Sequence, residues 1–275
     1  EQKVLILESE QVYRNPVIYR QKRQKEIIYT EEQKIAIRKF SGDYDRKIYK
    51  TYLLYGVTGS GKTEVYMEMI AKVLNDGRQA IVLIPEIALT YQTVMRFYTR
   101  FGERVSILNS RMSQGERYDQ MERVKKGEVD IMIGPRSALF TPFEKLGLIV
   151  IDEEHEPTYK SEQVPRFHAR ETAIERARME GASVVLGSAT PSLEAFYACE
   201  CGRYQMLRLK MRTRKQELPQ VYVADMREEL KHGNRSILSD RLEELMQDRL
   251  DKKEQMMLFL NRRGYAGFVS CRACG

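Results

Sequence analysis

Short apolar runs alternate with amphipathic segments along most of this chain. Runs rich in β-branched and aliphatic residues, bounded by Gly, Pro, Asn and Asp, are typical of strands. Most of these runs are continuously apolar, which favours strands that are buried on both faces of a parallel sheet. The predicted strands are Thr51–Tyr55, Ala80–Ile84, Val105–Leu108, Asp130–Ile133, Leu148–Ile151, Ser183–Leu186 and Gln205–Leu209.

The segments between the runs have helical periodicity. After Lys62, apolar residues recur at i, i+4 spacing and Asn75-Asp76-Gly77 provides a stop, which predicts an amphipathic helix. This order of strands and helices predicts an α/β fold.

A helix is also expected ahead of the first strand. Thr30 and Gln33 have the spacing of a capping box, and Ile35, Ile37 and Phe40 would face inward before Ser41-Gly42-Asp43 ends the helix.

Changes of pattern suggest three regions. Residues 1–28 are interpreted as a linker from a missing upstream region, residues 29–215 as one α/β domain, and residues 216–275 as the truncated start of a second. In the last region we expect a strand at Val221–Val223, a helix from Ser239 to about Lys253 and a strand at Met256–Leu260.

Composition narrows the class of protein. The chain has 275 residues, 46 Lys and Arg against 39 Asp and Glu, a formal charge of +7 and 42% hydrophobic residues, which suits a globular protein. Four cysteines and short apolar runs exclude a disulfide scaffold and predict no membrane span. We therefore expect a reducing, cytoplasmic location, while the charge alone is compatible with a polyanionic partner without requiring one.

A phosphate-binding loop follows the first predicted strand. Gly56-Val57-Thr58-Gly59-Ser60-Gly61-Lys62-Thr63 matches G-x-x-x-x-G-K-[ST] between a strand and a helix. Its glycines let the backbone N–H groups point at phosphate oxygens, its lysine brings a cation to the β- and γ-phosphates of ATP, and its last hydroxyl can ligate Mg²⁺. The predicted nucleotide contacts are Gly56, Thr58, Gly59, Ser60, Gly61, Lys62 and Thr63.

Acids follow the apolar run that ends at Ile151. Asp152 is predicted to hold the Mg²⁺ and Glu153 to activate the attacking water, which indicates hydrolysis. Taken alone, Glu154 and His155 are interpreted as a solvated strand end. The Ser188-Ala189-Thr190-Pro191 segment also follows a strand, where its hydroxyl groups can touch the acidic run or the γ-phosphate, or where it simply starts a helix.

Together these motifs resemble the superfamily-2 helicases, and within them the bacterial primosomal replication-restart helicases, the primosomal protein N′ family. The segments that carry the resemblance are GVTGSGKTEVY, LIPEIALT, GPRSALFTPF, LGLIVIDEEHEPTYK, RFHARE, LGSATPSLEA and FLNRRGYAGFVSCRACG. The resemblance implies a RecA-like ATP-binding domain followed by the beginning of a second RecA-like lobe.

The resemblance also implies roles for single residues. Gln33 would read adenine, and Arg136 and Ser137 match a DNA-backbone motif. The segment from Thr158 to Arg170 is similar to the aromatic-rich loop of this family. In it, the rings would stack on bases and the arginines would meet phosphates; these residues are Tyr159, Phe167, Arg166 and Arg170.

The four cysteines divide into two pairs. Cys271 and Cys274 have C-x-x-C spacing, and the resemblance implies that they open a zinc-binding insertion, although two thiolates are half of a tetrahedral site. Cys199 and Cys201 are interpreted as packed thiols in a helix.

The resemblance implies an ATP-dependent 3′→5′ DNA helicase motor that acts in replication restart and primosome assembly. Forked and single-stranded DNA, single-strand-binding protein, and primosome and helicase-loader proteins would be its partners, in a bacterial, nucleoid-associated setting. We expect this part alone to turn ATP over weakly. Another superfamily-2 translocase and a nucleotide-independent docking module for replication proteins remain alternatives.

Overall fold

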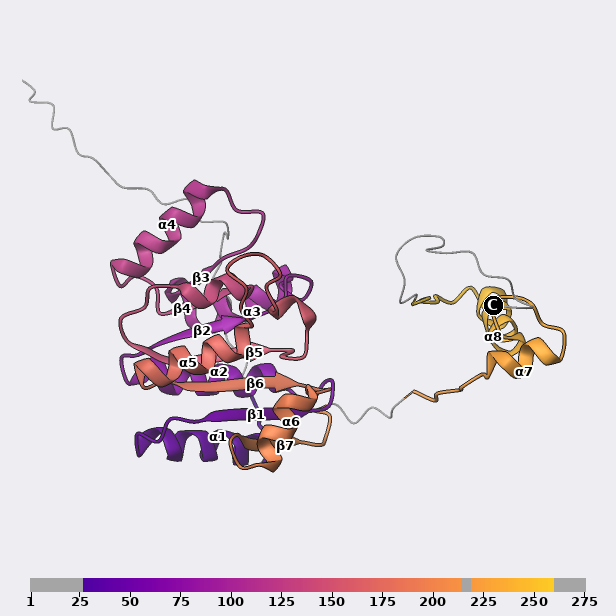
Figure 1. Cartoon of the computed structure of the whole chain (residues 1–275), viewed down its shortest axis with the longest axis horizontal. Coiled ribbons are helices and arrows are strands. Elements are labelled where there is room, and N and C mark those ends of the chain that lie inside the picture. Colours follow the sequence, from indigo (N-terminus) through magenta and orange to yellow (C-terminus); the bar gives the residue numbers. More distant parts are fainter. Residues whose placement is uncertain (1–26, 214–218, 260–275) are drawn as a thin grey trace, which may run out of the picture. The chain divides into compact units, whose positions relative to one another are not determined.

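The computed structural model describes residues 27–213 and 219–259, and the chain divides into two compact units, Glu1–Gln216 and Glu217–Gly275 (Figure 1). The predicted linker is outside the described residues except for Ile27 and Ile28, and its assignment stays a prediction, as does that of the other two regions.

The first unit is built on one parallel sheet of seven strands in the order β3-β4-β2-β5-β6-β1-β7. Every predicted strand of this unit is confirmed, with ends shifted by at most two residues. The strands are β1 (Thr51–Gly56), β2 (Gln79–Leu83), β3 (Val105–Ile107), β4 (Ile131–Gly134), β5 (Leu146–Asp152), β6 (Ser183–Ser188) and β7 (Gln205–Leu209).

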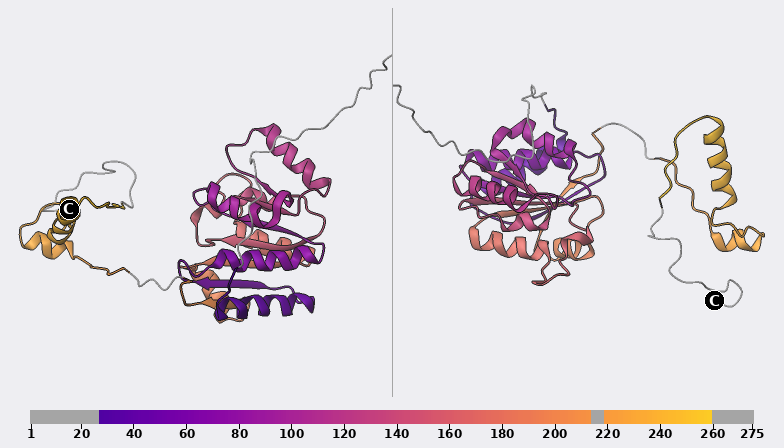
Figure 2. Two further views of the ribbon diagram at one scale, coloured as in Figure 1. Left: turned by 180° about the vertical axis from the view of Figure 1, so that it is seen from behind. Right: turned by 90° about the horizontal axis from the view of Figure 1, so that it is seen from above.

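Both faces of this sheet are buried, as the apolar runs predicted. In β5, Leu148 and Val150 belong to one hydrophobic cluster, whereas Ile149 and Ile151 belong to the other. The indigo and purple helices lie on one side of the sheet, and the salmon helix α5 (Ala169–Glu180) lies on the other (Figure 2, right). Because all strands are parallel, their carboxyl ends meet at one edge, where ligands collect in folds of this kind.

The helix after the phosphate-binding loop, α2 (Lys62–Asn75), has the predicted inward face. Val65, Tyr66, Met69, Ile70 and Val73 are at most 1% exposed, and the helix is capped at Asp76 within the predicted stop. This buried face belongs to the hydrophobic cluster on one side of the sheet, and the first turn of the helix follows β1 through the phosphate-binding loop.

The helix α1 (Glu31–Asp45) begins with the predicted capping box between Thr30 and Gln33. Two expectations about it are wrong. Ile35 is 61% exposed, because the buried stripe is formed by Ala36, Phe40 and Tyr44 instead. The helix also continues through Ser41–Asp43, since Asp43 is buried and bonded there rather than forming a turn.

The remaining helices of the first unit connect successive strands. Among the described residues, no helix combines the length and the apolar character needed to cross a bilayer. The helices are α3 (Tyr91–Phe101), α4 (Gln114–Lys125), α5 (Ala169–Glu180) and α6 (Leu193–Glu200), with short 3-10 turns η1 (Gly102–Arg104), η2 (Arg136–Phe140) and η3 (Pro157–Tyr159).

The second unit contains the predicted helix, α8 (Asp240–Asp251), capped by Ser239, and a helix that was not predicted, α7 (Met226–Lys231). The predicted strand Val221–Val223 is wrong, and residues 256–259 are not a strand either. Val223 is 94% exposed and Met257 95% exposed. An extended segment becomes a strand only when a neighbour pairs with its backbone, and apolar composition alone does not provide one.

Candidate nucleotide-binding and catalytic site

The phosphate-binding loop links β1 to α2 at the sheet's ligand-binding edge. Gly59 and Gly61 both have φ of +80°, a left-handed conformation that favours glycine. A Cβ added at Gly56 would lie 2.6 Å from Ser60 Oγ, so this position requires glycine for a close approach. The loop therefore has the tight curl that its sequence predicts.

The polar groups of the loop suit an anion. Lys62 is half-buried, and its Nζ donates to the Gly56 carbonyl at 3.0 Å, across the mouth of the loop. Thr63 follows in the first turn of α2, where helix N–H groups have no partner within the helix. Ser60 Oγ is buried and has no hydrogen-bond partner among the described residues. A hydroxyl group and helix N–H groups that lack hydrogen-bond partners can donate to phosphate oxygens, so the loop fits a triphosphate with its Mg²⁺.

Gln33 lies against this loop. Its Nε2 donates to the Ser60 carbonyl at 2.8 Å, and its Oε1 accepts the Thr30 N–H at 2.8 Å. Only 2% of the residue is exposed. Both ends of the Gln33 amide thus form hydrogen bonds within the protein in this conformation. The assignment of Gln33 to adenine recognition stays a prediction.

Thr213 is a contact that sequence reasoning missed. Its N–H and its hydroxyl each donate to the Gly59 carbonyl at 3.0 Å. Just before it, the N–H groups of Lys210 and Met211 donate to Glu32. The segment after β7 therefore connects the loop to α1, and no motif in the sequence indicated this.

Asp152 at the end of β5 lies close to the helix that carries Lys62. The Tyr66 hydroxyl, one turn further along α2, donates to Asp152 Oδ1 at 3.0 Å, and the Glu153 N–H donates to the same oxygen at 3.2 Å. Burial and the charge of Glu153 raise the pKa of Asp152, although the Tyr66 bond and the charge of Lys62 act in the opposite direction. The two predicted halves of the site therefore meet.

The position of the Tyr66 phenol requires a glycine in the neighbouring strand. A Cβ added at Gly187 in β6 would lie 1.4 Å from the Tyr66 hydroxyl oxygen, so only glycine leaves room for the phenol. Burial, followed by the charge of Asp152, raises the pKa of Tyr66 well above its ordinary value. The phenol therefore stays protonated and donates.

Glu153, the predicted base, has an unusual backbone conformation for a residue with a side chain, with φ of +47°. Such conformations are costly and gather at functional sites. His155 Nδ1 lies 3.8 Å from its carboxylate and 2.8 Å from Ser188 Oγ. The Ser188–Pro191 segment therefore contacts the histidine that follows the acids, and α6 begins shortly after it, at Leu193.

The interpretation of Glu154 and His155 as a solvated strand end is wrong. Glu154 is 2% exposed, and it accepts hydrogen bonds from the Ser192 N–H at 2.7 Å, the Ser192 hydroxyl at 3.0 Å and Arg170 Nη1 at 3.1 Å. The chain turns inward after Asp152, where α5 and the start of α6 provide donors.

Two residues expected to contact DNA are buried instead. Tyr159 is 1% exposed, with its hydroxyl 2.7 Å from the Asp152 carbonyl and 3.0 Å from that of Leu83, so its ring cannot stack on a base in this conformation. Arg170 is 6% exposed and paired with Glu154 and Glu171, so it does not reach a phosphate. Alternation of aromatic and basic residues along a loop does not show which of them point inward.

The other predicted DNA contacts lie at the surface or half-buried. Arg136 donates to the carbonyls of Thr158 at 2.7 Å and Lys160 at 2.9 Å, which braces the loop from η2, and Ser137 beside it is exposed. Phe167 packs edge-to-face on Phe140 with ring centroids 5.2 Å apart.

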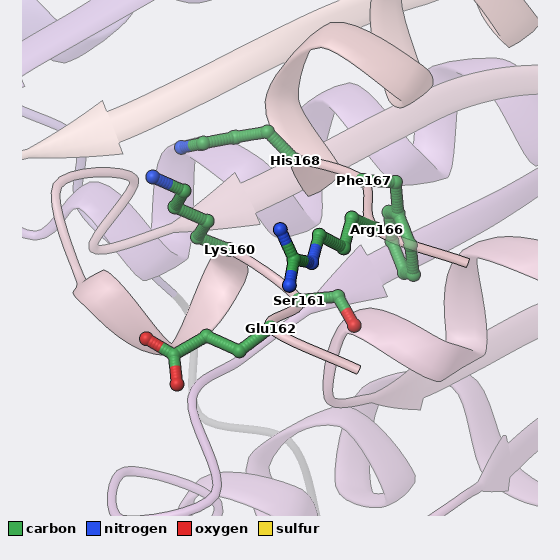
Figure 3. A pocket seen from close by; sticks show the side chains of 6 residues that line it. All are labelled: Lys160, Ser161, Glu162, Arg166, Phe167 and His168. Carbon is green, nitrogen blue, oxygen red and sulfur yellow. The ribbon is translucent and has the colours of Figure 1, made fainter. Parts of the chain in front are cut away.

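The loop also forms an open pocket of about 610 Å³ (Figure 3). Three cationic or imidazole side chains line it beside the half-buried Phe167 ring, while Glu162 extends away from Lys160. The lining residues are Lys160, Ser161, Glu162, Arg166, Phe167 and His168. Arg166 is exposed here, and its role stays a prediction.

Cys271 and Cys274 lie outside the described residues. Cys199 is half-buried against the hydrophobic core as predicted, whereas Cys201 is exposed, because it caps the end of α6. Within residues 27–213 and 219–259, no cluster of three or more His, Cys, Asp and Glu is arranged to hold a metal ion. A Mg²⁺ site needs fewer protein ligands, since this ion keeps several waters and binds substrate phosphates.

This chain is similar to known helicases and replication restart proteins. The profile of the DEAD/DEAH box helicases matches residues 30–197. Replication restart protein PriA of Bacillus subtilis is 49% identical over 276 residues, which cover 100% of this chain and 34% of that protein. Replication restart protein PriA of Haemophilus influenzae is 39% identical over 275 residues, which cover 98% of this chain and 37% of that protein. The chain thus spans about a third of the length of these curated relatives.

Solved structures share the fold. RecG bound to a three-way DNA junction aligns with a TM-score of 0.53 at 22% identity, over 70% of this chain and 25% of that one. The DUF1998 helicase MrfA aligns with a TM-score of 0.51 at 18% identity, over 86% of this chain and 39% of that one. The predicted RecA-like α/β fold is confirmed.

Proposed function

Because the chain belongs to the DEAD/DEAH box helicase family and resembles the PriA replication restart proteins along its whole length, we propose that it is the first ATP-binding motor domain of a replication-restart DNA helicase. In this proposal residues 29–215 form that domain and residues 216–275 begin the second lobe. ATP hydrolysis would drive 3′→5′ movement of the complete protein on DNA.

The observation that carries the proposal is the hydrogen bond from Tyr66 to Asp152. It joins the helix of the phosphate-binding loop to the strand that ends in acids, so one nucleotide can touch both. Bound MgATP would supply the phosphoryl group and the charge that polarises it.

The residues of this chain have distinct tasks in the proposal. Lys62 and the loop N–H groups bind the phosphates, and Gln33 is close enough to the loop to contact the base after a change of its hydrogen bonds. Thr63 and Asp152 hold Mg²⁺ together with its waters. Glu153 accepts the proton of the attacking water.

The nucleic-acid partner in the proposal is forked and single-stranded DNA. The exposed Arg166, the half-buried Phe167 and the pocket around them support a contact with the strand, in which a ring can stack and a guanidinium can pair with phosphate. Arg136 and Ser137 would contact the backbone nearby.

The complete protein would have further partners. Single-strand-binding protein and primosome and helicase-loader proteins are proposed from the resemblance, as is Zn²⁺ bound by Cys271 and Cys274 with ligands beyond them. With a third of the relatives' length, this chain is expected to hydrolyse ATP weakly on its own.

Nucleotide binding by this chain tests the proposal. Wild-type protein should bind MgADP in a calorimetric titration, and Lys62→Ala should weaken binding at least about 10-fold, since a charge-assisted contact to phosphate is worth about 1.5–3 kcal/mol. Lys72→Ala is the matched control, because Lys72 lies on the same helix and pairs with Asp45 at 2.5 Å. Equal affinities of wild type and Lys62→Ala would contradict the proposal.

A further inference from the structure

Asp152 is fixed through one of its two carboxylate oxygens. Oδ1 accepts both the Tyr66 hydroxyl at 3.0 Å and the Glu153 N–H at 3.2 Å. In the part of the chain that the structure describes, no hydrogen bond or ion pair to Oδ2 is found. The carboxylate thus has one oxygen held by the protein and one oxygen available to a ligand.

The donor Tyr66 is itself closely packed. It is 1% exposed within the hydrophobic core on the α2 side of the sheet, and Gly187 leaves space for its hydroxyl where any other residue would not. Three elements therefore contribute to this hydrogen bond. The phenol comes from α2, the carboxylate comes from β5, and Gly187 of β6 leaves the space that the phenol occupies.

The Asp152 backbone is held as well, from the opposite face. The Tyr159 hydroxyl lies 2.7 Å from the Asp152 carbonyl, and Tyr159 belongs to the hydrophobic cluster on the α5 side. With the main chain fixed there, the orientation of the carboxylate depends on the bond from Tyr66.

We infer that Tyr66 is a positioning residue for Asp152, which fixes Oδ1 so that Oδ2 is presented to hydrated Mg²⁺ bound with a nucleotide. The inference rests on the proposed function. Partners that orient a metal-binding side chain are commonly worth 10–100-fold in metal affinity. Tyr66 touches neither the metal nor the phosphates in this assignment, and it acts through Asp152 alone.

The test compares how strongly Mg²⁺ improves nucleotide binding. ADP is titrated into the 275-residue chain in Mg²⁺ and in EDTA, and the ratio of the two Kd values gives the Mg²⁺ preference. Tyr66→Phe, which removes a single oxygen, is expected to reduce this ratio about 10–100-fold while leaving the Kd in EDTA unchanged. No catalytic turnover is needed for the measurement.

Tyr52→Phe is a matched control. Tyr52 is also fully buried, and its hydroxyl also donates to a carboxylate at 3.0 Å, that of Asp43, which is not part of the site. Both variants lose one buried hydrogen bond, so melting curves show whether they lose similar stability. Only Tyr66→Phe should lose Mg²⁺ preference.

A double variant tests whether Tyr66 acts through Asp152. Asp152→Asn should itself reduce the Mg²⁺ preference, and adding Tyr66→Phe to it should cause no further reduction. An additional reduction would overturn the inference, as would a Tyr66→Phe protein with the wild-type ratio or with equal losses in both buffers. A wild-type chain that binds no ADP would overturn the proposed function, and the inference with it.

Discussion

Asp43 is a buried carboxylate near the end of α1, and it is surrounded by donors. Tyr52 donates to it at 3.0 Å, Lys39 lies 3.1 Å away, Arg46 2.8 Å and Lys50 3.7 Å. Burial raises the pKa of Asp43, but the bonds from Lys39, Tyr52 and Arg46 outweigh burial and lower it below the ordinary 3.8. A lowered pKa means that the folded state favours the charged form.

The pH dependence of this contribution has a definite sign. Asp43 stabilises the fold above its unfolded pKa of 3.8, and that stability is lost as the pH falls through the lower folded value. We expect Asp43→Asn to reduce the free energy of unfolding by about 1–2 kcal/mol at pH 7, because the cations are partly exposed and screened. Urea unfolding of both proteins between pH 7 and pH 3 should show the gap closing below pH 3.8. A gap that stays constant down to pH 3 would refute this account.

At the scale of residues, sequence motifs identified the residues proposed to bind phosphate and Mg²⁺, but not the residues that position them. Lys62 and Asp152 were predicted from a loop motif and a strand end, because phosphate and Mg²⁺ impose those residue types. Tyr66 and Gly187 had no such signal, since a buried tyrosine at helical spacing is indistinguishable from ordinary core. Tyr159 and Arg170 were assigned to DNA because a sequence gives residue types and not side-chain directions.

At the scale of elements, the pairing of Arg170 with Glu154 joins α5 to the turn after β5. Both side chains are at most 7% exposed, and Ser192 at the start of α6 donates to the same carboxylate. Three elements on the α5 side of the sheet thus share one ion pair. The turn that contains Glu153 is therefore fixed on one side by the Arg170–Glu154 ion pair and on the other by the hydrogen bonds to Asp152.

Removing one partner of a buried pair is costly. Arg170→Met leaves the Glu154 charge buried, so we expect it to lower the free energy of unfolding by about 3–5 kcal/mol. Arg178→Met is the control on the same helix, because Arg178 is 72% exposed where it pairs with Glu175, and it should cost at most about 0.5 kcal/mol. Urea denaturation at pH 7 measures both changes. Similar small losses in the two variants would show that the buried pair is not needed for stability.

The success of the strand predictions also has an explanation at this scale. Most strands of the first unit are buried on both faces, so their composition is continuously apolar and each pairs with another strand of the same sheet; the edge strand β7, with Gln205 and exposed Arg208, is an exception in composition. Val221–Val223 has the same composition, yet it forms no strand. A sequence window cannot reveal whether a partner strand exists, which is why the second unit was predicted worst.

For the molecule as a whole, the seven-stranded sheet is complete before the second unit begins. All its strands lie between Thr51 and Leu209, and the segment after β7 adds its contacts by Thr213. We expect a chain that ends at Gln216 to keep its cooperative unfolding and to change its melting temperature by less than about 2 °C, because it loses no strand of this sheet.

A shorter chain separates the sheet from the contacts that follow it. Ending at Leu209 removes the bonds from Lys210 and Met211 to Glu32 and the two bonds from Thr213 to Gly59, while every strand remains. We expect this truncation to melt several degrees lower, since each lost hydrogen bond contributes about 1 kcal/mol, and to bind MgADP more weakly than the chain that ends at Gln216. Calorimetric melting and titration of the two chains measure the difference. If both bind and melt alike, the segment after β7 does not support the phosphate-binding loop, and the loop's shape comes from its glycines and from α2 alone.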